Sequence, residues 1–151
     1  MELNIGDRIP EFTLKDQQGR EFSSVDSLGS PSVIYFYPKN FTPGCNREAC
    51  GFRDSYEDFT DLGAKVIGIS SDSEASHQKF AKRYRLPFTL LADSGGKVRG
   101  LFGVKKGLLG MLPGRETFVF DKDGKLTFKF SAIGADPHIK KALKHLKKTT
   151  E

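Results

Sequence analysis

The chain has 151 residues, of which 37% are hydrophobic and 28% charged, with a formal net charge of +5. This length predicts one domain, residues 1–151, with a sizeable buried core. No apolar run reaches the roughly 20 residues of a membrane-spanning helix, and the N-terminus has no basic-then-apolar signal pattern. We therefore expect no membrane contact and a cytoplasmic protein, or a plastid protein if a transit peptide has been removed.

The first third of the chain predicts a small hairpin and a buried strand. Residues 12–14 and 21–23 could pair as the N-terminal hairpin. Residues 32–37, SVIYFY, form a dense β-branched and aromatic run, which is typical of a buried strand. Pro38 ends this strand because proline cannot donate to a sheet.

The pattern becomes helical at Pro43, and Gly63 marks the expected end of this helix. The helix carries apolar side chains on one face, at Ala49, Phe52, Tyr56 and Phe59.

Strands and helices alternate through the middle of the chain. Residues 65–70, KVIGIS, predict a second buried strand, and residues 74–84 a second helix. Residues 88–92 predict a short third strand, and residues 96–102 a short helix. This alternation of strand and helix is typical of an α/β protein with parallel strands.

The last part of the chain predicts a hairpin and a basic helix. Residues 116–121 and 125–130 flank a turn that contains Gly124, so they should pair antiparallel. The C-terminal helix has a lysine face and an apolar face, which favours a solvated surface helix over a nucleic-acid site. We therefore predict an α/β sandwich with a mixed central sheet flanked by helices, and no nucleic-acid partner. The apolar face carries Ile139, Ala142, Leu143 and Leu146.

Both cysteines, Cys45 and Cys50, lie in the stretch NFTPGCNREACGF. A structural disulfide over five residues would restrain little chain entropy. A metal site would need two more ligands, and the three histidines are scattered without ligand spacing. Two inert core thiols remain an alternative, because free cysteine is often a small buried residue.

The surroundings of Cys45 favour a reactive thiol instead. Pro43 is suited to the first position of a helix, and Thr42 is a natural N-cap whose hydroxyl would compete for the free amides. Cys45 would then lie among unpaired N–H groups at the positive end of the helix dipole, where the nucleophilic thiolate is favoured. Gly44 would let the backbone approach a small ligand.

The spacing of Cys50 from Cys45 predicts a helix that opens. Five residues apart on an intact helix, the two Cα atoms would be separated by about 8.7 Å. A disulfide tolerates roughly 7 Å. The sulfurs can bond only if the first turns unwind, which suits a cycle in which Cys45 is oxidised first and Cys50 attacks afterwards.

Three stretches of the chain resemble the peroxiredoxins. The pattern Pro38-x-x-x-Thr42-x-x-Cys45 is similar to their active-site signature. The strings YFYPKNFTPGCNREACGFRDSYEDF, VIGISSDSEASHQKFAKRYRLPFTLLAD and LPGRETFVFDKDGK resemble the bacterioferritin-comigratory-protein, or peroxiredoxin Q, subfamily. The likeness covers nearly the whole chain, from about Ile5 to Leu146.

This resemblance implies a thioredoxin-like fold and a monomeric enzyme that reduces hydrogen peroxide and organic hydroperoxides. Cys45 would be the peroxidatic cysteine and Cys50 the resolving one, joined in a disulfide that thioredoxin or a similar dithiol reduces. Thr42 and Arg115 would bind the thiolate and the peroxide, and Pro38 would shield the pocket. The resemblance implies no metal and no cofactor.

The chemistry of peroxide cleavage supports an arginine at this site. Charge develops along the O–O bond, and a guanidinium offers a permanent charge and several donors. Arg115 begins a predicted strand that could lie beside the cysteine loop, whereas Arg47 and Arg53 precede no buried strand. Glu48 could orient the arginine or could face solvent.

Two positions depart from the resemblance, because Asn40 and Asn46 stand where an aspartate and a threonine are expected. We expect these departures to tune the rate only.

An apolar loop, residues 105–113 (KKGLLGMLP), either caps the core or forms a rim for bulky hydroperoxides or thioredoxin.

Two other functions remain open. A disulfide oxidoreductase of the same fold would usually carry Cys-x-x-Cys, which this chain lacks. A binding or chaperone module would carry two inert thiols.

Overall fold

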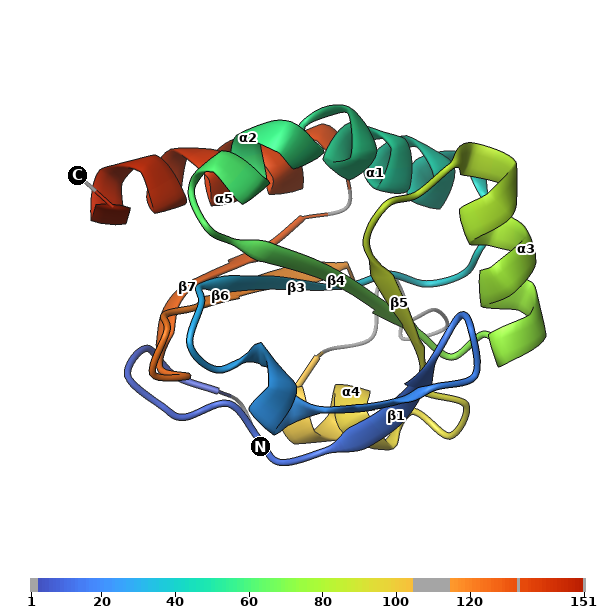
Figure 1. Ribbon diagram of the computed structural model, residues 1–151, viewed down its shortest axis with the longest axis horizontal. Coiled ribbons are helices and arrows are strands. Elements are labelled where there is room, and N and C mark those ends of the chain that lie inside the picture. Colours follow the sequence, from blue (N-terminus) through green and yellow to red (C-terminus); the bar gives the residue numbers. More distant parts are fainter. Residues whose placement is uncertain (1–2, 105–114, 133, 151) are drawn as a thin grey trace.

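A seven-stranded mixed sheet runs through the centre of the protein, in the order β2-β1-β5-β4-β3-β6-β7 (Figure 1). The computed structural model describes residues 3–104, 115–132 and 134–150. The strands are β1 Thr13–Asp16, β2 Glu21–Ser23, β3 Ser32–Phe36, β4 Lys65–Ser70, β5 Thr89–Ala92, β6 Glu116–Phe120 and β7 Leu126–Ser131.

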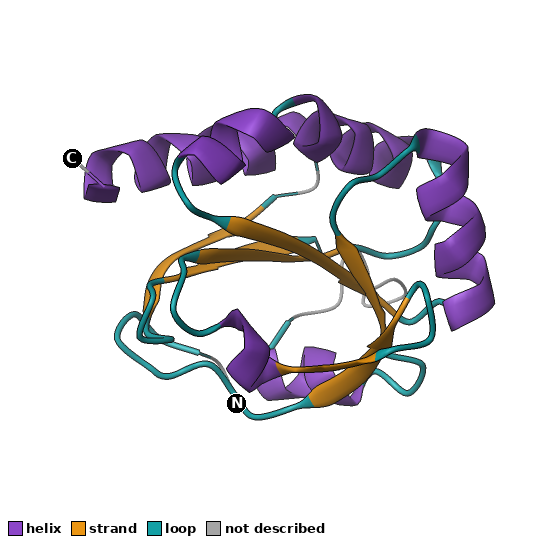
Figure 2. Ribbon diagram, viewed as in Figure 1, coloured by secondary structure: helices purple, strands orange, loops and turns teal. Residues whose placement is uncertain are grey.

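Helices cover both faces of this sheet. The helices α1, α2 and α5 lie along one face, and α4 lies on the opposite face (Figure 2). The α/β sandwich with a mixed central sheet, predicted from the sequence, is therefore confirmed. The helices are α1 Pro43–Asp54, α2 Tyr56–Asp61, α3 Glu74–Tyr84, α4 Lys97–Phe102 and α5 Asp136–Thr150, with a short 3-10 helix at Ser24–Ser27.

The central strand β3 is buried on both faces, as its unbroken apolar sequence predicts. Its side chains alternate between two cores. Val33 and Tyr35 belong to the core under α1, α3 and α5, whereas Ile34 and Phe36 belong to the core on the α4 side. β3 pairs parallel with β4 and antiparallel with β6, so β6 begins at the end where β3 leads into the cysteine loop and runs away from it.

Several elements have the bounds that the sequence predicts. β4 and α3 match residues 65–70 and 74–84, and β6 and β7 form the predicted antiparallel hairpin. The apolar face of α5 is buried at Ile139, Ala142 and Leu146. Within the described ranges, no helix is long and apolar enough to cross a bilayer.

The predicted single helix from Pro43 to Gly63 is wrong. α1 ends at Asp54, Ser55 leaves helical geometry with ψ at 6°, and α2 begins at Tyr56. Serine competes with the helix for backbone hydrogen bonds, so it is a favourable position for a break.

The N-terminal hairpin forms as predicted, with Leu14 opposite Phe22. The sequence did not reveal that β1 also pairs with β5 and so joins the main sheet, with Lys15 opposite Ala92.

Candidate active site

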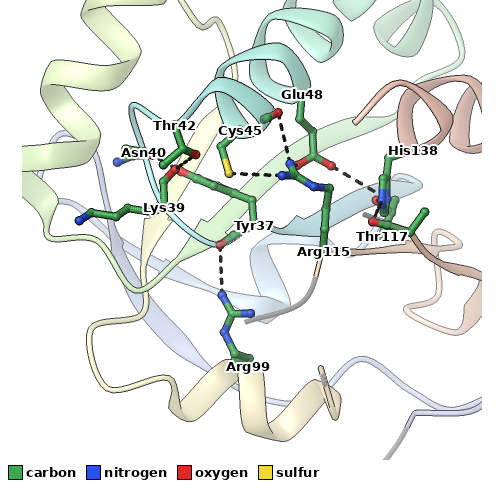
Figure 3. A network of polar contacts seen from close by, with 12 residues as sticks. Tyr37, Lys39, Asn40, Thr42, Cys45, Glu48, Arg99, Arg115, Thr117 and His138 are labelled. Carbon is green, nitrogen blue, oxygen red and sulfur yellow. Dashed lines mark hydrogen bonds and ion pairs between the residues drawn. The ribbon is translucent and has the colours of Figure 1, made fainter. Parts of the chain in front are cut away.

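Cys45 lies at the N-terminal end of α1, directly after the loop that leaves β3. It is the third residue of the helix, and Pro43 is the first. The residue is 2% exposed, and its Sγ accepts a hydrogen bond from Nη2 of Arg115 at 3.6 Å (Figure 3). The sulfur therefore has a guanidinium on one side and the positive end of a helix on the other.

Arg115 reaches the sulfur because of strand register. It immediately precedes β6, and Glu116 pairs with Phe36 at the end of β3. The guanidinium also donates through Nη1 to the carbonyl of Gly44 at 3.4 Å. A Cβ at Gly44 would lie 2.9 Å from Nη2 of Arg115, so glycine is what allows this approach.

Glu48 is a further partner of Arg115. Its Oε1 accepts from Nη1 of Arg115 at 2.6 Å, and the residue is 0% exposed. Of the two alternatives for Glu48, the structure shows the one in which it orients the arginine. Burial raises the pKa of Glu48 to about 8, and the charge of Arg115 opposes this rise. Burial lowers the pKa of Arg115, but the charges of Glu48 and Cys45 outweigh it, and the net direction is upward.

Thr42 stands at the N-cap position, but the predicted use of its hydroxyl is wrong. The hydroxyl donates to the carbonyl of Lys39 at 2.8 Å and makes no side-chain cap to the helix amides. The intervening Phe41 has a left-handed backbone with φ at 63°, which closes a tight turn and brings that carbonyl within reach. The oxygen of Thr42 keeps its lone pairs for another donor.

Cys50 lies on the same unbroken helix as Cys45, and both thiols are free. Cys50 is partly buried. This arrangement is the one for which the sequence predicted that the sulfurs cannot meet until the helix opens. Pro38 is partly buried beyond the end of β3, and its shielding role stays a prediction.

The two rival arginines lie elsewhere. Arg47 is exposed, and Arg53 donates to the carbonyl of Tyr84 at 2.7 Å and pairs with Asp54. Neither of these contacts involves Cys45. The apolar loop 105–113 lies outside the described residues, so its two interpretations stay open.

Sequence reasoning missed the residues that hold Tyr37, the last residue before Pro38. Arg99 of α4 donates through Nη2 to the carbonyl of Tyr37 at 3.1 Å, and the Tyr37 hydroxyl donates to Asn40 at 2.6 Å. Burial lowers the pKa of Arg99. The sequence offered one indication of this contact, which is the arginine at position 99 among the apolar residues of the predicted helix at 96–102.

Asn40 stands where an aspartate was expected, and its side-chain amide donates a hydrogen bond inside the protein. It is 3% exposed, and its Nδ2 lies 2.9 Å from Nδ1 of His77. The Nε2 of His77 donates to the carbonyl of Leu91 at 2.9 Å, so Nδ1 is left as the acceptor. An ionised aspartate could not donate there.

Among the residues that the structure describes, no group of three or more histidine, cysteine, aspartate or glutamate side chains could hold a metal ion. The arrangement can instead hold a thiolate and stabilise negative charge that develops beside it. It suits nucleophilic attack by sulfur on a small electrophile.

Comparison with known proteins gives a consistent result. The model of the AhpC/TSA family matches residues 5–129. A chloroplastic peroxiredoxin Q of Sedum lineare is 53% identical over 142 residues, which are 93% of this chain and 76% of that protein.

Two solved structures are similar over nearly their whole lengths. The peroxidoxin BcpB of Mycobacterium tuberculosis superposes with a TM-score of 0.89 and 40% identity, over 97% of this chain and 98% of that one. The bacterioferritin comigratory protein of Xanthomonas campestris, studied for its alkyl peroxide reduction, gives a TM-score of 0.86 and 28% identity, over 93% and 92%. The predicted thioredoxin-like fold is thereby confirmed.

Proposed function

The chain belongs to the AhpC/TSA family and is a thiol peroxidase, and from this premise we propose that Cys45 and Cys50 carry its reaction. The observation that supports this assignment best is the contact between Arg115 and the Sγ of Cys45, at the N-terminal turn of α1. The family implies peroxide substrates and a thioredoxin-type reductant.

In the first step, the Cys45 thiolate attacks the terminal oxygen of a hydroperoxide. A sulfur–oxygen bond forms, the O–O bond breaks, and the sulfur is oxidised by two electrons to a sulfenic acid. The remaining oxygen leaves as hydroxide or alkoxide and takes up a proton to become water or an alcohol. Arg115 and the free amides of the first helical turn stabilise the charge that develops on this oxygen.

Thr42 and Pro38 would shape the pocket for the peroxide. The hydroxyl hydrogen of Thr42 is engaged by the carbonyl of Lys39, so its oxygen can accept a hydrogen bond from the O–H of the hydroperoxide. Pro38 would keep bulk water from the thiolate. Both roles follow from the resemblance to the peroxiredoxin signature.

In the second step, Cys50 attacks the sulfenic sulfur. A Cys45–Cys50 disulfide forms and the sulfenic oxygen leaves as water, after the N-terminal turns of α1 have opened. An external dithiol then returns two electrons and two protons by two thiol–disulfide exchanges. We propose thioredoxin or a close relative as this dithiol.

We further propose that the chain works as one domain and as a monomer. We also propose a reducing compartment, which would be the cytoplasm or, as the names of the plant relatives suggest, a chloroplast. The alternatives of a disulfide oxidoreductase and a non-enzymatic binding or chaperone module are not favoured by the comparisons.

Mass spectrometry of the reduced protein after one equivalent of hydrogen peroxide tests the assignment. The wild type should lose two hydrogens and both free thiols. Cys50→Ser should stop at a sulfenic acid that dimedone traps, and Cys45→Ser should not react. Peroxide turnover by Cys45→Ser with thioredoxin would overturn the assignment, and reduction of insulin without peroxide consumption would support the oxidoreductase.

A further inference from the structure

A buried chain of polar side chains continues from the active site to the far side of α1. It runs from Arg115 through Glu48 to His138 of α5 and Thr117 of β6 (Figure 3). Glu48, His138 and Thr117 are each 0% exposed. Burying polar groups costs free energy unless their hydrogen bonds are satisfied. The hydrogen-bond partners in this cluster therefore indicate which atoms carry a proton.

The contacts of His138 define its tautomer. Its Nε2 lies 2.9 Å from the carbonyl oxygen of Ala132, which can only accept, so Nε2 carries the hydrogen. Burial lowers the pKa of His138, the hydrogen bond to Ala132 opposes this, and the positive charge of Arg115 adds to the lowering. The net direction is downward, so the ring is neutral near pH 7. The Nδ1 atom is then an acceptor, and the Thr117 hydroxyl donates to it at 2.7 Å.

A carboxylate oxygen of Glu48 also faces Nδ1 of His138. Its Oε1 is bound to Arg115, but its Oε2 has no hydrogen-bond partner among the described residues and lies 4.0 Å from Nδ1 of His138. The single lone pair of Nδ1 already accepts the hydrogen of Thr117, so neither His138 nor Thr117 has a hydrogen to give to Oε2. An ionised carboxylate would place a buried charge on an oxygen to which no described residue donates, and a proton on Oε2 removes this cost.

We propose that His138, held by Thr117, is a positioning residue that keeps Glu48 protonated and so leaves the charge of Arg115 to Cys45 and the bound peroxide. An ionised Glu48 at 2.6 Å would neutralise the guanidinium, whereas a neutral carboxyl group leaves its charge 3.6 Å from the sulfur. This inference rests on the proposed function, in which Cys45 is the residue that reacts with peroxide.

The other titratable groups that face Glu48 do not compete for this proton near neutral pH. Tyr35 and Tyr37 of β3 interact with its charge, but burial raises both of their pKa values well above the usual range, so both phenols are neutral. Arg115 stays charged, and Cys45 is the nucleophile itself. Burial raises the pKa of Glu48 to about 8, in agreement with a protonated carboxyl group at pH 7.

The variant His138→Gln tests the proposal. The glutamine amide can still donate to the carbonyl of Ala132 but has no nitrogen at the position of Nδ1. The hydroxyl hydrogen of Thr117 is then free to turn to Oε2, which favours the carboxylate, so Glu48 should ionise at lower pH. We expect the limb where the rate of Cys45 oxidation by hydrogen peroxide declines to move about one pH unit lower than its midpoint near pH 8 in the wild type. The protonated fraction of Glu48 at pH 7 then falls from about 0.9 to about 0.5, so the rate falls about twofold at pH 7 and about tenfold at pH 9.

His145 provides the matched control on the same helix. Its Nε2 lies 3.0 Å from the hydroxyl of Thr127, and its ring stacks on Phe128 much as His138 packs against Phe130. His145→Gln should therefore lose a comparable contact and leave both the rate and its pH profile unchanged. Equal rates and equal pH profiles for wild type and His138→Gln would overturn the proposal.

Infrared spectroscopy of the reduced wild type tests the proton directly, even if His138→Gln does not fold. The carbonyl stretch of a protonated carboxylic acid should be present at pH 7, vanish with a midpoint near pH 8, and be absent from Glu48→Gln. An absent band at pH 7 would overturn the proposal. Peroxide consumption by Cys45→Ser would instead overturn the proposed function, and the infrared band would still decide where the proton lies.

Discussion

The two halves of α1 differ in what holds them. The N-terminal half, from Pro43 to Glu48, is held by polar contacts to Arg115. The C-terminal half places Ala49 and Phe52 in the apolar core, where the ring of Phe52 stacks on Tyr35 with centroids 4.5 Å apart. Of residues 43–48, only Cys45 belongs to that core, so opening the N-terminal half disturbs the core less than opening the C-terminal half.

This difference explains how a helix can carry both cysteines. In the proposed reaction, the N-terminal half supplies free amides to Cys45, and free amides are a feature of a helix end that frays easily. The anchored half keeps Cys50 near the site while the first turns unwind. The predictions below test each half in turn.

The largest effect is expected in the anchored half. Phe52→Ala removes a ring that is 0% exposed and should lower the free energy of unfolding by about 3–5 kcal/mol. Urea denaturation followed by circular dichroism measures this change. Val25→Ala, at a residue that is 58% exposed, should change it by less than about 0.5 kcal/mol. Similar values for the two variants would show that the core does not anchor α1.

Arg115→Met removes the polar contacts of the N-terminal half of α1 and should lower the rate of Cys45 oxidation. Loss of the donor to Cys45 should slow oxidation by hydrogen peroxide by about 10²–10³-fold, or about 2.7–4 kcal/mol. Quenched-flow mass spectrometry measures the rate. Arg53→Met is the control, because Arg53 also donates to a backbone carbonyl but away from the sulfur. A loss below threefold for Arg115→Met would contradict its role.

Gly44→Ala changes the same half by one methyl group. The added Cβ would lie 2.9 Å from Nη2 of Arg115, so the guanidinium should move away from the sulfur. We expect about a tenfold slower reaction with peroxide, since a small misplacement of a catalytic group is costly. The free energy of unfolding should change by less than about 1 kcal/mol, because alanine favours the helix. An unchanged rate would mean that the guanidinium is not closely held.

The last prediction concerns how the free energy of unfolding depends on pH through Glu48. The pKa of Glu48 is higher in the folded protein, about 8, than its usual 4.5, so the folded state binds the proton more tightly. The stability from this group is fully present below pH 4.5 and is lost as pH rises through about 8, by at most about 1.4 kcal/mol per pH unit. Glu48→Gln should remove this slope in denaturation series between pH 5 and 8.5. Parallel slopes for the two proteins would contradict the raised pKa.

Local sequence patterns predicted much of the fold. The buried strand at residues 65–70 and the helix at 74–84 have their predicted bounds because the apolar runs and the Ser73 N-cap are local signals. The pairing of β1 with β5 was missed because it depends on packing between distant segments. The break at Ser55 was missed because a single serine is a weak local signal within an apolar helical pattern.

The same division applies to the site. Cys45 at a helix start and Arg115 before a strand could be found from local sequence. The hydroxyl of Thr42 turned to Lys39 because of the left-handed residue between them, which no pattern indicated. Arg99 on α4 and His138 on α5 reach the site only because these helices pack on the sheet, so sequence spacing could not reveal them.

Hydrogen exchange of α1 in the reduced protein and in the Cys45–Cys50 disulfide form tests the opening of the helix most directly. Formation of the disulfide should strongly accelerate amide exchange in residues 46–48, while residues 49–54 keep their protection. Unchanged protection of residues 46–48, with the disulfide verified by intact mass, would contradict the requirement that α1 unwinds before its two sulfurs meet.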